Sequence, residues 1–182
     1  MTNESIPLRI GLIGAGAIVQ LSHLPVLSEL SEVEVRAIAD PGTERAEALA
    51  REYGIAPYSD HRDMISGEDL DAVLIAIPNH LHLAVIRDAA AAGLHVFCEK
   101  PLAHRLEDAL EIERLMLERG LVGQIGFNQR FRTPVSLARQ AIESGVLGEV
   151  QAFRSVYSES WEVYPSVTRY RYDLAQSGGA AI

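Results

Sequence analysis

The sequence has little cysteine, little lysine and no long apolar run. Its 182 residues include one cysteine, and Lys100 is the only lysine beside fifteen arginines. A single cysteine cannot close an intrachain disulfide, so nothing indicates an oxidising compartment. The longest apolar run, at 72–77, is far shorter than the ~18–20 residues of a membrane span. The first residues lack the basic stretch and cleavage site of a secretory signal, so we expect a cytoplasmic protein.

Positive charge is also scarce. Sixteen basic against 25 acidic side chains give a net charge of −9, and the basic residues form no cluster. This balance argues against nucleic acids and anionic membranes as partners. With 48% hydrophobic and 23% charged residues, the composition is that of a globular protein rather than a disordered one. The length predicts one complete domain and a fragment of another.

Apolar segments of strand length alternate with helical patterns over the first 127 residues. The segment 72–77 has no polar position, which is typical of a parallel strand covered on both faces. The predicted strands lie at 8–14, 33–39, 56–58, 72–77, 95–99 and 122–127, with helices between them up to residue 30 and at 43–53, 61–65, 81–93 and 106–120. This alternation predicts an α/β fold with a doubly wound parallel sheet.

The pattern changes after this region. Thr133 as N-cap and Pro134 as first helical residue predict a helix, which Gly145 can end. The segment 149–160 predicts a long strand, and no periodicity follows Trp161. We therefore expect a first domain at 1–128 and the beginning of a second at 129–182.

A glycine-rich segment, GLIGAGAIV at 11–19, joins the first predicted strand to the first helix. Gly14 and Gly16 occupy the first two glycine positions of the dinucleotide fingerprint, where the backbone approaches a pyrophosphate at a helix N-terminus. Val19 stands at the third position, where glycine or alanine is usual. The alternative interpretation is a plain tight turn.

Asp40 ends the second predicted strand, as expected for the acidic residue of such a site. A carboxylate there accepts hydrogen bonds from both ribose hydroxyls and repels a 2′-phosphate, which favours NAD over NADP. Alternatively, Asp40 caps the helix after Pro41. Arg45, one turn further on, keeps NADP open.

Polar residues also follow the fourth predicted strand, in the segment PNHLH at 78–82. Because ligands of open α/β sheets lie at the carboxyl ends of the strands, these side chains can reach a cofactor. The alternative is that Asn79 or His80 caps the next helix. His80 and His82 are two residues apart and share no helix face, so we expect no metal site.

The segment Glu99-Lys100-Pro101 follows the fifth predicted strand, at the same edge. Pro101 ends the strand and restricts Lys100 to extended dihedral angles. An ammonium group in a partly dry cleft can polarise a substrate oxygen or exchange a proton with it, and Glu99 can pair with it. Cys98 is expected to pack as a buried thiol.

Together these motifs, with GFNQRF at 126–131 and ESGVLGEV at 143–150, resemble the glucose-fructose oxidoreductase / inositol dehydrogenase (Gfo/Idh/MocA) family over essentially the whole chain. The resemblance implies an N-terminal Rossmann domain that binds NAD(P), followed by an α/β domain with a largely antiparallel sheet. It implies a cis Lys100–Pro101 bond and a catalytic Lys100 that contacts substrate and nicotinamide. The cofactor site is expected to comprise Gly14, Gly16, Ala17, Ile18, Asp40, Pro78, Asn79, His82, Glu99, Lys100, Gln129 and Arg130.

Members of that family are longer than this chain. Their second domain supplies a glycine-rich turn, followed by an aspartate and a histidine beside the lysine. Residues 177–182 resemble the start of that turn, and the chain stops before either residue. One hypothesis is therefore an NAD(P)-dependent oxidoreductase that transfers hydride to or from a sugar- or cyclitol-like substrate and is a homo-oligomer when intact. The alternative is a dinucleotide-binding module without catalysis, either a sensor or an inactive fragment.

Overall fold

The computed structural model describes residues 6–156 and 173–177. These residues form two compact units. The first contains residues 6–126 and 173–177, and the second contains residues 127–156. Each unit is described by itself.

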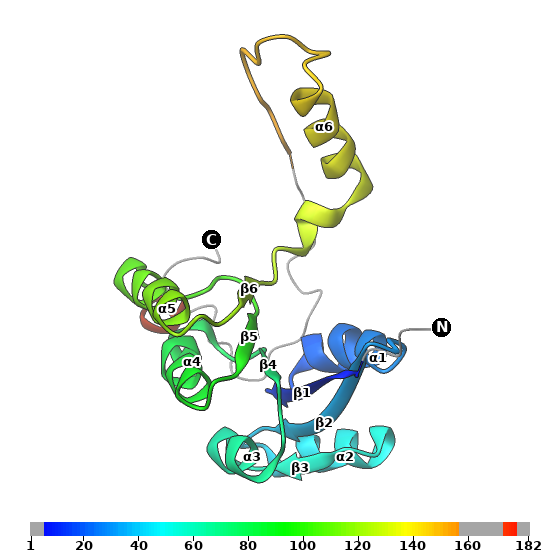
Figure 1. The fold of residues 1–182 in the computed structure, drawn as a ribbon, viewed down its shortest axis with the longest axis vertical. Helices are drawn as coiled ribbons and strands as arrows, with labels where there is room; N and C mark the ends of the chain where they lie inside the picture. Colours follow the sequence, from blue (N-terminus) through cyan, green and yellow to red (C-terminus); the bar gives the residue numbers. More distant parts are fainter. Residues whose placement is uncertain (1–5, 157–172, 178–182) are drawn as a thin grey trace. The chain divides into compact units, whose positions relative to one another are not determined.

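The first unit is built on a six-stranded parallel sheet with the strand order β3-β2-β1-β4-β5-β6 (Figure 1). The strands are β1 (Leu8–Ile13), β2 (Val33–Ala39), β3 (Ala56–Tyr58), β4 (Ala72–Ile75), β5 (His95–Cys98) and β6 (Gly123–Ile125). The order reverses between β1 and β4, so the chain leaves these neighbouring strands in opposite directions. In open α/β sheets the ligand crevice lies outside the carboxyl ends of the strands at such a reversal. The predicted doubly wound Rossmann sheet is confirmed.

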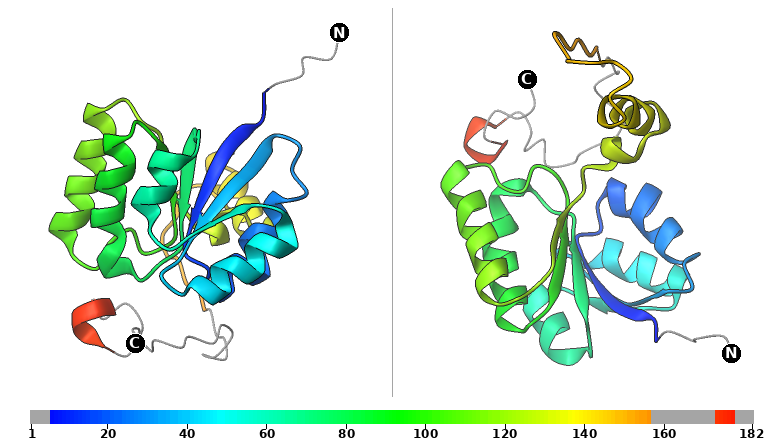
Figure 2. Two further views of the ribbon diagram at one scale, coloured as in Figure 1. Left: turned by 90° about the horizontal axis from the view of Figure 1, so that it is seen from below. Right: turned by 45° about the horizontal axis from the view of Figure 1, so that its top comes forward.

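Helices cover both faces of this sheet (Figure 2). On one face α1 (Leu24–Leu27) and α2 (Thr43–Tyr53) pack on side chains such as Leu12, Ile38 and Leu74. On the other face α3 (His61–Gly67), α4 (His82–Ala91) and α5 (Leu106–Glu118) pack on Ile75 and Val96, among others. All four positions of β4 are buried, as its unbroken apolar sequence predicts.

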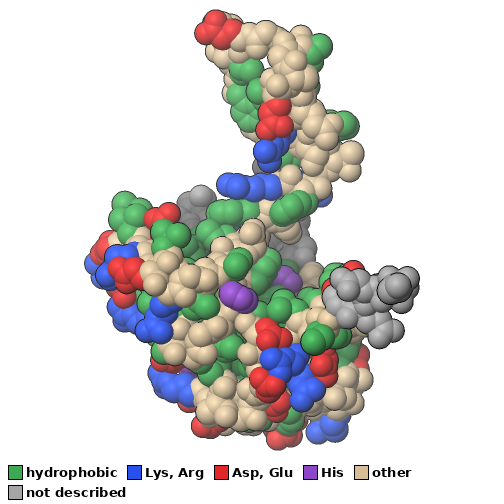
Figure 3. Space-filling model, viewed as in Figure 1, with side chains coloured by type: hydrophobic (Ala, Val, Ile, Leu, Met, Phe, Trp, Pro, Cys, Tyr) green, Lys and Arg blue, Asp and Glu red, His purple; other side chains and the backbone are tan. Residues whose placement is uncertain are grey.

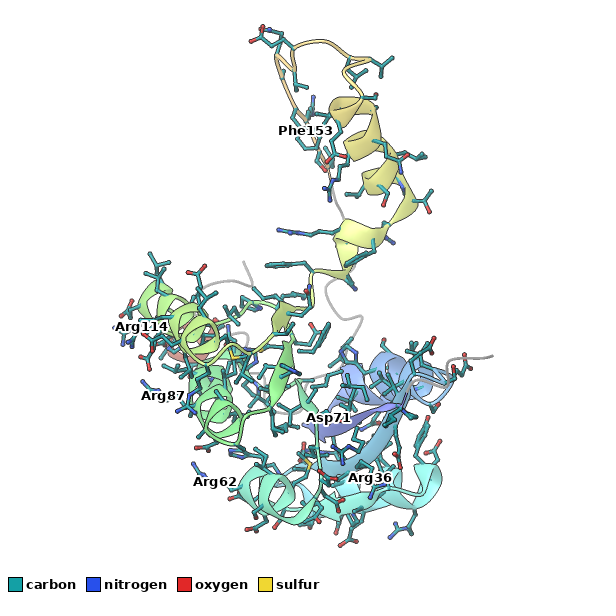
Figure 4. The ribbon with its side chains drawn as sticks, in the orientation of Figure 1. Arg36, Arg62, Asp71, Arg87, Arg114 and Phe153 are labelled. Atoms are coloured by element: carbon teal, nitrogen blue, oxygen red, sulfur yellow. The ribbon has the colours of Figure 1, made fainter. Side chains whose placement is uncertain are left out.

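Most charged side chains of the first unit lie on its outside. The labelled Arg62, Arg87 and Arg114 extend from α3, α4 and α5, and each pairs with a carboxylate (Figure 4). On the face shown in Figure 3, basic and acidic side chains are interspersed over this unit. Exposed ion pairs contribute ~0–1 kcal/mol each, so the stability of the unit comes mainly from its two apolar layers.

The first helical segment departs from a regular α-helix. A π-helical turn, η1 (Val19–His23), precedes α1, and the helix ends at Leu27 rather than near residue 30. In this turn the N–H of Leu24 donates to the carbonyl of Val19. Pro25 has no N–H to donate, so the regular ladder is interrupted at this point. A π-turn adds a residue to the helix and so changes the directions of the side chains that follow.

The second unit contains η3 (Asn128–Phe131) and α6 (Thr133–Glu143). The helix before Gly145 is confirmed, but Thr133 is its first residue and not its N-cap, which is Arg132. The strand predicted at 149–160 is wrong for residues 149–156, which are irregular, and its last four residues lie outside the described ranges. A strand needs a hydrogen-bonding neighbour, and none of the described strands pairs with this segment.

Two smaller elements complete the described structure. A 3₁₀ turn, η2 (Asn79–Leu81), precedes α4, and α7 (Leu174–Ser177) contacts η2. Within the described ranges, no helix has the length and apolar character needed to cross a membrane.

Candidate functional site

The glycine turn after β1 contains two glycines with different requirements. Gly14 has a φ of +108°, and a Cβ there would lie 2.4 Å from the carbonyl oxygen of Ala76. The fold itself therefore requires glycine at this position. Gly16 has no positive φ, and a Cβ there would meet nothing within 4 Å. Packing within the protein does not explain why residue 16 is glycine. A ligand that lies close to the backbone of the turn would explain it.

Asp40, at the end of β2, holds this turn in place. Its Oδ2 accepts the N–H of Ala15 at 2.7 Å, and its Oδ1 accepts the N–H of Gly42 at 2.7 Å and the guanidinium of Arg45 at 2.9 Å. The residue is buried. Asp40 does not cap α2, whose N-cap is Gly42 without a side-chain bond. The structure thus brings the predicted acidic residue directly onto the glycine turn.

The polar residues after β4 do not act as helix caps. Pro78 precedes η2 and Leu81 precedes α4, and neither helix start has a side-chain cap, so the capping alternative for Asn79 and His80 is wrong. Asn79 is buried, and its Nδ2 donates to the carbonyl of Ser177 at 3.1 Å. Its buried Oδ1 accepts no hydrogen bond from the part of the chain that the structure describes. A buried acceptor left open at this edge fits a polar ligand group.

His82 lies beneath this edge rather than on its surface. Its side chain is buried, and its ring nitrogens lie 3.0 Å from the carbonyl oxygens of Ile77 and Leu102. Burial lowers the pKa of His82 below its ordinary value, although these carbonyl groups raise it. His82 therefore ties the chain after β4 to the chain after Pro101.

Cys98 is also buried, with its Sγ 3.2 Å from Nδ1 of His82. Burial, followed by the charge of Glu99, raises the pKa of Cys98 to about 12. A thiol with this pKa is not a nucleophile at neutral pH, which agrees with the predicted packing role.

Glu99 follows β5, and its partner is His23, which was not among the predicted site residues. Nε2 of His23 lies 2.9 Å from Oε1 of Glu99, and Oε2 accepts the backbone N–H of Lys100 at 3.2 Å. Burial raises the pKa of Glu99, but His23 and Lys100 together lower it below its ordinary value. Lys100 contributes its backbone N–H to Glu99, and the side chain of Lys100 is exposed. The Lys100–Pro101 peptide bond is cis, as the resemblance implied.

A signal for His23 was present in its spacing. Gly16, Gln20 and His23 follow at i, i+4 and i+7, which would be the spacing of one face in a regular α-helix. The side chain of Gln20 donates to the carbonyl of Ala15 at 2.7 Å, within the glycine turn.

The remaining predicted residues fall in three places. Ala17 and Ile18 form the first helical residues after Gly16, and Pro78 immediately precedes η2. Gln129 and Arg130 belong to the second unit, where the guanidinium of Arg130 lies 5.1 Å from the ring centroid of Phe127. Their contact with a cofactor stays a prediction.

His80 faces His104, with ring centroids 6.3 Å apart. Over residues 6–156 and 173–177, no group of three or more histidine, cysteine, aspartate or glutamate side chains is placed to hold a metal ion.

The glycine turn, Asp40, Asn79 and Lys100 follow β1, β2, β4 and β5, and parallel strands bring their carboxyl ends to one edge. An open glycine next to an acidic residue, at the reversal of strand order, defines a dinucleotide-binding Rossmann unit. The sequence profile of the Gfo/Idh/MocA family, described as "Oxidoreductase family, NAD-binding Rossmann fold", matches residues 8–127. The chain belongs to this family.

Three relatives illustrate the similarity. The chain is 35% identical over 149 residues to levoglucosan dehydrogenase of Pseudarthrobacter phenanthrenivorans, covering 81% of the chain and 38% of that enzyme. The WlbA dehydrogenase of Bordetella pertussis, solved with NADH and UDP-GlcNAcA, has a TM-score of 0.75 and 30% identity, with 79% and 44% covered. Scyllo-inositol dehydrogenase of Lactobacillus casei, solved with NAD(H) and scyllo-inositol, has a TM-score of 0.74 and 27% identity, with 79% and 43% covered. The chain spans less than half the length of each.

Proposed function

We propose that the protein is an oxidoreductase that transfers hydride between NAD(H) and a carbon bearing a hydroxyl group on a sugar or cyclitol. The observation that carries the proposal is the common edge of the sheet, where the glycine turn of an NAD-binding family and the exposed Lys100 both lie. The levoglucosan and scyllo-inositol dehydrogenases support the substrate class, because both act on polyhydroxylated rings.

The binding roles follow from the contacts described above. The open backbone at Gly16 and the helical N–H groups of Ala17 and Ile18 would receive the pyrophosphate. Asp40 would accept hydrogen bonds from the ribose hydroxyls, and its negative charge would repel the 2′-phosphate of NADP. Arg45 neutralises part of that charge, so NADP stays an alternative cofactor. The open Oδ1 of Asn79 would accept an N–H or hydroxyl donor of the cofactor.

When bound, the nicotinamide supplies the hydride acceptor or donor. In the oxidising direction, the C–H bond of the carbinol carbon and the O–H bond of its hydroxyl group both break. Lys100 would donate a hydrogen bond to the carbinol oxygen and stabilise the negative charge that develops there, while the hydroxyl proton passes to the water that reaches the exposed edge at Lys100. The buried His82 would hold the segment after Pro101, which keeps the ammonium group directed at the edge.

The remaining parts of the proposal concern the whole protein. Residues 1–128 would form the cofactor domain, and residues from 129 onward would contribute to a substrate and oligomerisation domain, where Gln129 and Arg130 would approach the cofactor. We place the protein in the cytoplasm, where NAD(H) is available and a free thiol such as Cys98 stays reduced.

The test is NADH formation by the protein expressed from its complete gene, assayed with a panel of sugars and cyclitols. Lys100→Ala should lower kcat about 10²- to 10⁴-fold, as expected for loss of a group that acts at the reacting oxygen. Arg114→Ala, which removes an exposed positive charge from α5, is the matched control and should leave kcat unchanged. Turnover of Lys100→Ala at the wild-type rate would exclude the assigned role, and NAD⁺ binding without turnover of any substrate would favour a non-catalytic module.

A further inference from the structure

His23 reaches across the edge of the sheet from the helix that begins at the glycine turn. Its Nε2 lies 2.9 Å from Oε1 of Glu99, which is 76 residues further along the chain. Only 18% of each side chain is exposed, so the pair is largely shielded from water. The ring of His23 also meets the ring of Phe97 edge to face, with centroids 5.9 Å apart. The roles proposed above involve neither the Nε2 atom of His23 nor its ring.

The carboxylate of Glu99 connects His23 to the backbone of Lys100. Its Oε1 is paired with His23, while its Oε2 accepts the N–H of Lys100 at 3.2 Å. The N–H of Glu99 itself donates to the carbonyl of Ile75 at 2.9 Å, within the sheet. The peptide unit before Lys100 is therefore held between the sheet and a carboxylate whose position depends on His23.

The carboxylate has little room to move. A Cβ at Gly126 would lie 3.2 Å from Oε1 of Glu99, so the chain after β6 closes over this group. His23 and Lys100 lower the pKa of Glu99 against the effect of burial, so the group is charged at neutral pH and accepts strong hydrogen bonds.

We propose that His23 is a positioning residue for Lys100, acting through Glu99 to link the helix after the glycine turn to the segment that carries the ammonium group. This inference rests on the proposed function. The His23–Glu99 pair would then hold the cofactor-binding glycine turn and the substrate-binding Lys100 in a fixed position relative to one another. Misplacement of a catalytic group by about 1 Å can cost about 10²-fold in rate, so a single hydrogen bond at this point can matter.

Two substitutions separate the hydrogen bond from the packing of the ring. His23→Phe keeps an aromatic ring against Phe97 and removes the donor, whereas His23→Gln keeps an N–H donor and removes the ring. In the protein expressed from its complete gene, His23→Phe should lower kcat about 10- to 100-fold, with the Kd for NAD⁺ within about threefold of wild type. His23→Gln should restore most of kcat. A kcat kept in His23→Phe but lost in His23→Gln would show that the ring acts by packing. Either that result or equal losses in the two variants would overturn the proposal.

A matched control exists in the same unit. Nε2 of His61 lies 2.9 Å from Oδ2 of Asp88, with 17% of the histidine side chain exposed, but this pair joins α3 to α4. His61→Phe should leave kcat unchanged. If His61→Phe lowers kcat as much as His23→Phe does, the effect is a general loss of a buried pair, and the proposal is wrong.

A second measurement does not depend on turnover. Because Lys100 is the only lysine of the 182-residue chain, an amine-selective acylating reagent followed by mass spectrometry reports on its side chain. Saturating NAD⁺ should slow acylation of Lys100 in the wild type and in His23→Gln, but not in His23→Phe. The same protection in His23→Phe would overturn the proposal.

The outcomes also separate this inference from the proposed function. If Lys100→Ala keeps wild-type turnover, the role of Lys100 fails. If Lys100→Ala is inactive but His23→Phe matches the wild type, only the role of His23 fails. Should His23→Phe not fold, Glu99→Gln decides, since its amide can accept only one of the two hydrogen bonds. A kcat lowered about tenfold or more supports the proposal, and an unchanged kcat overturns it.

Discussion

The two glycines of the turn after β1 give a sharp test, because the structure assigns them different purposes. Gly14→Ala places a Cβ at a φ of +108° and 2.4 Å from the carbonyl oxygen of Ala76. Gly16→Ala adds the same methyl group two residues later, where nothing lies within 4 Å. The first change should affect folding, and the second should affect the cofactor alone.

The magnitude for Gly14 combines two costs. A non-glycine residue at a disfavoured positive φ costs about 1–3 kcal/mol, and forcing a methyl group into packed backbone costs about 1–3 kcal/mol more. A total of about 4 kcal/mol lowers the Tm of a domain of this size by roughly 8–16 °C. Because domains are stable by ~5–15 kcal/mol, Gly14→Ala should still fold at low temperature.

The magnitude for Gly16 has the opposite pattern. Alanine at a relaxed position leaves stability unchanged or raises it by about 0.4–1 kcal/mol, through the unfolded chain. A methyl group between the turn and a pyrophosphate should weaken NAD⁺ binding at least about tenfold, since that position brings backbone against phosphate. Thermal unfolding and calorimetric titration with NAD⁺ measure both quantities. Equal Tm values for the two variants would refute the role of Gly14, and wild-type NAD⁺ affinity in Gly16→Ala would refute that of Gly16.

Three further predictions concern single side chains. Because burial raises the pKa of Cys98 to about 12, a thiol reagent at about pH 8 should label it only after denaturation, and fast labelling of the folded protein would contradict this burial. The side chain and backbone N–H of Arg9 lower the pKa of Asp71, so this pair stabilises the fold above the unfolded pKa of ~3.9, and the stabilisation is lost as pH falls through the lower folded value. Urea unfolding should show Asp71→Asn destabilised at about pH 7 and less destabilised near pH 2, and a pH-independent difference would be inconsistent with the pairing. Asp40→Asn should raise affinity for NADP⁺ relative to NAD⁺ at least about tenfold by removing a charge that repels the 2′-phosphate, and an unchanged preference in binding titrations would exclude this role.

The sheet could be predicted because its signals are local. The unbroken apolar run from Ala72 and the glycine turn at Gly14 each identify a strand or its end within a few residues of sequence. Strand ends were less certain: β4 stops at Ile75 instead of residue 77, and the carbonyl of Ile77 contacts the ring of His82.

The contacts of the site could not be read in the same way. His23 and Glu99 are 76 residues apart, and only the strand order brings the first helix beside β5. Asn79 resembles a helix cap in sequence, yet its amide bonds to Ser177, 98 residues away. The strand expected from residue 149 has good local propensity, but propensity cannot supply the neighbouring strand that would pair with it.

The central claim is that the carboxyl edge of this sheet binds NAD(H) through the glycine turn and Asp40. Calorimetric titration of the 182-residue chain with NAD⁺, beside NADP⁺, tests it most directly. We predict saturable binding of NAD⁺ at one site, with NADP⁺ binding more weakly. No binding of NAD⁺, or binding that Gly16→Ala and Asp40→Asn leave unchanged, would contradict the account.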